Sequence, residues 1–181
     1  MNNVLFKNIT RFIILMLIQV LVLNNMNLGG YLNPYIYILF ILLLPANINR
    51  SFLLILAFGT GLTVDYFGNT LGLHAAACVV IAFMRPGTIN LFFRNYEFNG
   101  NEEPGPSSIG YRGFLKYAIS LMFIHQLILF YFEVFSFSNF FFTLSKVLLS
   151  TVLSVILIMI AVLLTGKRKK NHHPAWQDHN S

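Results

Sequence analysis

The chain has 181 residues, of which 56% are hydrophobic and only 10% are charged. Soluble domains usually carry about 25% charged residues, so this composition excludes an ordinary soluble domain and favours one membrane-embedded unit. The formal net charge of +6 comes from Lys and Arg lying between apolar runs. Nucleic-acid binding requires these charges on one basic face or stripe, so we do not expect it.

Six apolar segments follow one another along the chain and predict an all-α, six-helix transmembrane bundle over 1–166. A membrane-spanning helix needs about 20 residues, and the second, third and fourth segments are short by that standard. The single cysteine, Cys78, lies in the fourth segment, and one cysteine cannot form an intrachain disulfide. The expected spans cover residues 12–28, 31–44, 52–67, 71–84, 114–135 and 140–164.

The segments that flank the spans alternate along the chain between containing Lys and Arg and containing neither. Lys and Arg precede the first span, follow the second, fourth and sixth, and are missing from the turns after the first and third. This alternation predicts that both termini lie in the cytoplasm. No small-x-small cleavage site follows the first span, so we expect that span to be retained. A basic tail over 167–181 is expected to be disordered and cytoplasmic, in contact with anionic lipids.

The longest polar stretch, residues 85–113, is rich in Asn, Gly, Pro and Ser. Such a composition is typical of a loop, here placed in the cytoplasm. Its apolar part, residues 88–93, is consistent with a helix lying in the membrane interface.

The third and fourth spans carry a distinctive polar pattern. Ionisable groups at membrane depth are costly and therefore mark candidate sites. Gly61 and Asp65 share one helix face, and a tight turn brings Asp65 near His74 of the next helix. We expect an Asp65–His74 hydrogen bond. A structural clamp between the two helices is favoured over a ligand or proton site. The residues of this pattern are Gly59, Gly61, Asp65, Gly68, Gly72 and His74.

A second set of polar residues lies in the last two spans. Glu133 and Lys146 flank the turn between these spans and are expected to form an ion pair at the outer end. His125 and Gln126 lie near mid-membrane, where interhelical hydrogen bonds are favoured over a proton relay.

Motifs of nucleophilic, zinc-dependent or nucleotide-dependent enzymes are missing from the sequence. We therefore expect no catalytic residue, no metal and no cofactor.

The stretch from Pro45 to Arg85 resembles the MreD family of rod-shape-determining membrane proteins. The resemblance is carried by Pro45, by the Gly-rich helix ending at Asp65, by the Leu-Gly opening of the next helix at Gly72, and by the Met-Arg-Pro exit at 84–86. In layout it covers most of the chain, but in motif only about 40 residues.

The resemblance implies a non-enzymatic scaffold of the cell-wall elongation machinery that lies in the bacterial inner membrane and maintains rod cell shape. Implied partners are the bitopic membrane protein MreC and, through it, the actin-like MreB, the glycan polymerase RodA and its transpeptidase. The family is similar in fold to the substrate-binding subunits of energy-coupling-factor vitamin transporters. The 29-residue loop over 85–113 is long for the family.

Two alternatives remain open at this point. Six short helices could enclose a vitamin-like small molecule near their outer ends, as in a transporter subunit, with Asp65, His74 and Glu133 as polar anchors. The chain could also be a membrane enzyme of lipid or cell-wall intermediates that depends on Asp65 or His74.

Overall fold

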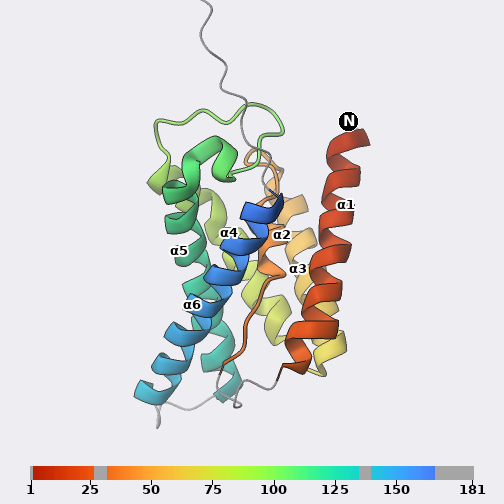
Figure 1. Cartoon of the computed structure of the whole chain (residues 1–181), viewed down its shortest axis with the longest axis vertical. Coiled ribbons are helices and arrows are strands. Elements are labelled where there is room, and N and C mark those ends of the chain that lie inside the picture. Colours follow the sequence, from red (N-terminus) through yellow and green to blue (C-terminus); the bar gives the residue numbers. More distant parts are fainter. Residues whose placement is uncertain (1, 27–31, 135–139, 166–181) are drawn as a thin grey trace, which may run out of the picture.

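A computed structural model describes residues 2–26, 32–134 and 140–165 of the chain. These residues contain helices and no strand. Five of the helices are long and apolar enough to cross a membrane, which identifies a multi-pass α-helical membrane protein. Figure 1 shows them as one bundle, in which the start of α1 and the end of α6 point toward the same end. The tail over 167–181 lies outside the described residues.

The first span is a composite helix. α1 covers Asn2–Leu17 and continues through a π-helical turn, η1 (Ile18–Val22), into a 3-10 turn, η2 (Leu23–Asn25). π-helical turns inside longer helices are rare and occur frequently at functional sites. Here the turn contains Gln19, which is buried.

The second segment is not a membrane-spanning helix, so the expectation of a helix over 31–44 is wrong. Residues 32–36 run without helical structure, and only α2 (Ile38–Leu42) is helical. Pro34 lies inside the segment and cannot donate a backbone hydrogen bond to a helix. In Figure 1 this part of the chain runs between the helices, from the far end of α1 back toward its start. All residues from Pro34 to Leu44 are buried.

α3 (Arg50–Gly68) and α4 (Leu73–Phe92) form a helical hairpin. The Asn49 side chain caps the start of α3 by accepting a hydrogen bond from the backbone N–H of Ser51 at 2.9 Å. Asn69, with φ of 51°, ends the helix in the left-handed conformation that helix C-termini commonly adopt. Both helices are longer than the expected spans 52–67 and 71–84.

α5 (Pro106–Val134) and α6 (Phe140–Thr165) complete the bundle. Gly110, with φ of 71°, separates a first short turn of α5 from its long remainder. Residues at both ends of the predicted loop 85–113 are therefore helical, and the connection shortens to 93–105. The apolar stretch 88–92 continues α4, so no separate interfacial helix exists there. The sequence did not predict this longer α4 because Pro86 suggested that the helix ends there, whereas α4 continues past Pro86.

Candidate functional site

Asp65 joins the two helices of the α3–α4 hairpin. Its carboxylate accepts hydrogen bonds from the backbone N–H groups of His74 at 3.1 Å and Ala75 at 2.8 Å, and from the Thr70 hydroxyl. The first N–H groups of a helix have no partner within that helix, and a negative charge there is also favoured by the helix dipole. Asp65 is thus the cap of α4, supplied from the end of α3. The expected Asp65–His74 hydrogen bond exists through the His74 main chain, not its imidazole.

The glycines of the motif differ in what they do. A Cβ at Gly61 would lie 2.6 Å from the Ala75 backbone nitrogen, so only glycine allows this approach of α3 to α4. Gly72 has φ of 81°, a conformation that favours glycine. A Cβ at Gly68 would meet only the Thr70 side chain, at 3.7 Å, and a Cβ at Gly59 would meet nothing within 4 Å. Gly61 and Gly72 therefore serve the hairpin, whereas Gly59 leaves space on another side of α3.

The His74 imidazole takes part in a buried network with Tyr37 and His125. The Tyr37 hydroxyl oxygen lies 3.0 Å from His74 Nδ1 and 2.9 Å from His125 Nε2. The Cys78 thiol lies 3.7 Å from the same oxygen. One hydroxyl has one proton, so Tyr37 donates to one imidazole and accepts from the other.

The direction of these hydrogen bonds follows from an atom that has no partner. His125 Nδ1 is buried and makes no hydrogen bond within the described part of the chain. A buried N–H without an acceptor is rarer in proteins than an unused lone pair. We therefore assign the proton of His125 to Nε2, which donates to Tyr37, while Tyr37 donates to His74 Nδ1.

The network connects three passes of the chain through the bundle. The first is residues 32–44, here called the buried crossing, which contain Tyr37. The other two are α4, with His74, and α5, with His125. Tyr35 packs edge-on against both histidines, at ring-centroid distances of 5.0 Å and 5.8 Å. Among the described residues, no group of three or more His, Cys, Asp or Glu side chains is placed to hold a metal ion. The arrangement fixes the crossing within the bundle by polar contacts.

Side chains of neighbouring helices form hydrogen bonds with backbone N–H and C=O groups of the buried crossing. Gln19 accepts from the N–H of Ile36 at 2.9 Å and donates to the carbonyl of Pro34 at 3.2 Å. Ser154 of α6 accepts from the N–H of Tyr35 at 2.9 Å. Irregular backbone is tolerated at membrane depth only where protein surrounds it and such partners are available. These contacts explain why this segment does not need to be helical.

Gln126 joins α5 to α6 through an interhelical hydrogen bond, as expected from the sequence. Its Nε2 lies 3.3 Å from Ser154 Oγ and 3.5 Å from the Asn33 carbonyl oxygen. Its Oε1 is buried without a hydrogen bond, and so is Thr151 Oγ1, within the ranges that the structure describes. The middle of the bundle thus holds polar atoms with unused bonding capacity.

Arg85 is buried completely, whereas its sequence position suggested a charge at the membrane surface. Its guanidinium donates to the Tyr117 hydroxyl at 2.9 Å, to the Pro45 carbonyl at 3.3 Å, to the Leu44 carbonyl, and to the Leu42 carbonyl at 3.5 Å. These carbonyls lie at and just beyond the end of α2, where a positive charge is favoured. Arg85 therefore holds the end of the buried crossing.

The structure brings Glu133 and Lys146 together. Lys146 Nζ lies 3.9 Å from Glu133 Oε2 and 4.5 Å from the centre of the Phe130 ring. Part of the turn expected between them, residues 135–139, lies outside the described residues. Because Glu133 is half-exposed, the pair contributes at most about 1 kcal/mol to stability.

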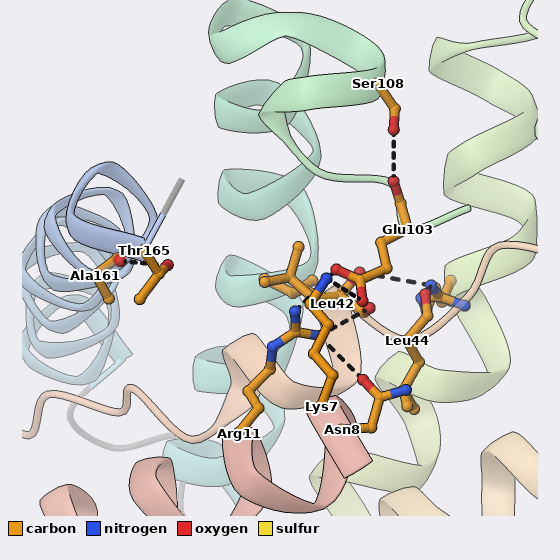
Figure 2. Close-up of polar contacts among 11 residues, drawn as sticks. Lys7, Asn8, Arg11, Leu42, Leu44, Glu103, Ser108, Ala161 and Thr165 are labelled. Carbon is orange, nitrogen blue, oxygen red and sulfur yellow. Dashed lines mark hydrogen bonds and ion pairs between the residues drawn. The ribbon is translucent and has the colours of Figure 1, made fainter. Parts of the chain in front are cut away.

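The opposite end of the bundle carries a second charge cluster, which the sequence alone did not reveal. Glu103, in the connection between α4 and α5, lies 2.9 Å from Lys7 Nζ and 2.8 Å from Arg11 Nη2. Arg11 also donates to the Leu43 carbonyl and to the Asn8 side chain. Figure 2 shows Glu103 reaching from the Ser108 side of the cluster to both cations of α1. The connection over 93–105 thus ties the start of α1 to the rest of the bundle.

Several residues of these networks were absent from the sequence-based candidates, notably Gln19, Tyr37, Ser154 and Glu103. The only available signal was a polar group within an apolar run, which Gln19 and Ser154 satisfy. Their partners lie far away in the sequence, so the contacts could not be assigned. Comparison with known proteins finds no matching family model, no curated relative and no similar solved structure at a significant level.

Proposed function

We propose that this chain is a non-enzymatic membrane scaffold of the bacterial cell-wall elongation machinery, which maintains rod cell shape together with MreC and MreB. The observation that carries the proposal is what the motif residues do. Gly61, Asp65 and Gly72 serve to join α3 to α4, and none of them points a reactive group into a cavity. A motif with this use suits a protein whose task is to hold a shape.

The outer surface of the bundle supports the same proposal. Many large apolar side chains are exposed on α3, α4 and α6, among them Phe52, Phe83 and Phe141. In a membrane these positions face lipid or another helix, and helix association there relies on close packing and shape. A single helix of a bitopic partner such as MreC would bind this surface, and RodA with its transpeptidase would join through that partner.

The proposed orientation has both termini in the cytoplasm and the chain in the inner membrane. Among the described residues, Lys7 and Arg11 contact Glu103 of the connection between α4 and α5. Arg50 begins α3, and Arg94 follows α4. In Figure 1 the start of α3 and the end of α4 lie at the same end of the bundle as the start of α1. Such an excess of cations supports the cytoplasmic placement of that side.

The decisive experiment is depletion of the protein in its host, with cell width and length measured by microscopy. We expect rod cells to widen and round up, and the unchanged gene to restore them. Copurification of the bitopic partner with the tagged full chain supplies a second readout. Normal width and shape after depletion would refute the proposal.

The alternative of a vitamin-binding transporter subunit is favoured by one observation. The Tyr37–His74–His125 network and the unpartnered Gln126 Oε1 place hydrogen-bonding groups in the middle of the bundle. Mass spectrometry of small molecules released from the purified protein distinguishes the two functions. A stoichiometric vitamin-like ligand that is lost in Gln126→Leu would favour the transporter subunit.

A further inference from the structure

A groove lies between α1 and α3 on the outside of the bundle. Its volume is about 690 Å³, within the range of sites that bind small ligands. Apolar side chains line it from both helices, including Leu5, Ile9 and Phe12 of α1 and Ile55 of α3. Gly59 also lines the groove, and a Cβ built there meets no atom within 4 Å. A side chain at this position of α3 would therefore project into the groove.

The groove is closed at one end and covers about half of the membrane. α3 contacts the first span at η1 (Ile18–Val22), which lies far from the start of α1. The α3 residues that line the groove run from Phe52 to Thr63, which corresponds to about 16 Å at 1.5 Å per residue. The hydrocarbon core of a bilayer is about 30 Å thick. The groove therefore matches the depth of one leaflet, and the contact at η1 would obstruct a helix that crosses the whole membrane.

The open end of the groove is lined by polar side chains, and cations that are not themselves lining residues lie next to it in the chain. Asn8, Asn47 and Asn101 line it there. The Lys7 side chain, next to Asn8, is 58% exposed even though it contacts Glu103. Arg50 is exposed and lies two residues before Phe52. Glu103 balances one of the two cations that it contacts, Lys7 and Arg11, so the mouth of the groove retains positive charge.

We propose that the groove between α1 and α3 binds an anionic phospholipid of the leaflet at the basic end, with an acyl chain against Gly59 and the headgroup at Lys7, Arg50 and the three asparagines. The apolar lining, the depth of one leaflet and the charge at the mouth each fit this ligand. A lipid in this position fills the gap between two helices whose main contact lies at η1. It would thereby hold α1 against α3 in the half of the membrane where protein contacts are few.

The test uses the full chain, purified in detergent and freed of lipid, with phosphatidylglycerol or phosphatidylcholine added as the probe. Native mass spectrometry counts the lipids that remain bound to each variant. We expect one phosphatidylglycerol to be retained by the unchanged protein and lost in Gly59→Phe, whose ring fills the groove. The matched control is Gly87→Phe on α4, because Gly87 also has no atom within 4 Å of its Cβ but does not line the groove. This control should bind lipid as the unchanged protein does.

A second variant pair tests the headgroup and guards against misfolding. Arg50→Gln should lower the preference for phosphatidylglycerol over phosphatidylcholine about fivefold, the effect expected of one cation near an anionic surface. Thr63→Leu should weaken binding as Gly59→Phe does, and the melting temperature of each variant shows whether it is folded. Equal lipid binding by folded Gly59→Phe and Gly87→Phe, or equal binding of the two lipids, would overturn the proposal. A further outcome would also overturn the proposal: Gly59→Phe binds lipid normally but loses a copurifying membrane protein. The groove would then be the binding site of a partner helix.

Discussion

Gly59 and Gly61 lie two residues apart on α3 but face opposite surroundings. Gly61 faces α4, where the Ala75 backbone occupies the position that a side chain would need. Gly59 faces the groove toward α1, where nothing lies within 4 Å. The same residue type therefore creates close contact on one side of the helix and an open space on the other.

The difference extends to the elements on either side. α3 and α4 form one of the closest helix pairs of the described bundle and are joined again by Asp65 at their turn. α1 meets α3 through η1, packs Phe12 against Phe40 of α2, and is held near its start by Glu103. Packing along a whole helix gives a rigid unit, whereas contacts at separate points leave room for motion and for a ligand.

The largest effect is expected from Gly61→Val. The new side chain would overlap the backbone of α4, and forcing helices apart in a packed interior costs about 3 kcal/mol. Thermal unfolding of the purified protein in detergent measures this loss. Gly59→Val is the matched control and should change stability little, because its side chain enters the groove. Equal destabilisation by both variants would remove the distinction between the two sides of α3.

A slightly smaller effect is expected from Asp65→Ala. It leaves the N–H groups of His74 and Ala75 without their acceptor, and replacing a side-chain cap at a helix start by Ala costs about 0.5–2 kcal/mol. Hydrogen exchange at these two amides should rise in Asp65→Ala. Thr70→Val removes only one of the donors to Asp65, so it should change that exchange much less. Unchanged exchange in Asp65→Ala would show that the hairpin does not depend on the cap.

The smallest effect is expected from Glu103→Gln, which tests the loosely attached side. Losing the charge weakens contacts with Lys7 and Arg11, and partly exposed pairs contribute about 1 kcal/mol or less. Hydrogen exchange in the first turns of α1 should increase, while exchange in α3 and α4 stays the same. The change should shrink at high salt, since salt screens such pairs. Equal loosening of α3 and α4 would contradict the separation of the two regions.

The long helices were predictable because lipid imposes a simple rule on sequence. Each of the five spans needs a long apolar run, and α3 and α6 match the expected ranges within a few residues. Asp65 and Gly61 were also identifiable, because a carboxylate and a glycine on one face of an apolar helix suggest a close helix contact. The hydrogen-bond partners of Asp65 were not predictable, because they are backbone N–H groups, which every residue type except proline has.

The buried crossing shows where such rules end. The hydropathy of residues 32–44 predicts that they are shielded from water. A helix in lipid and an extended segment inside the protein have the same hydropathy, so hydropathy does not distinguish them. Only the tertiary structure decides between them, because it places Gln19, Ser154 and Arg85 where the crossing needs hydrogen-bond partners. Sequence by itself determined that the chain lies in a membrane and approximately where its five long helices lie. Tertiary structure decided which apolar segment could leave the helical form, since the groups that replace helical hydrogen bonds come from distant parts of the chain.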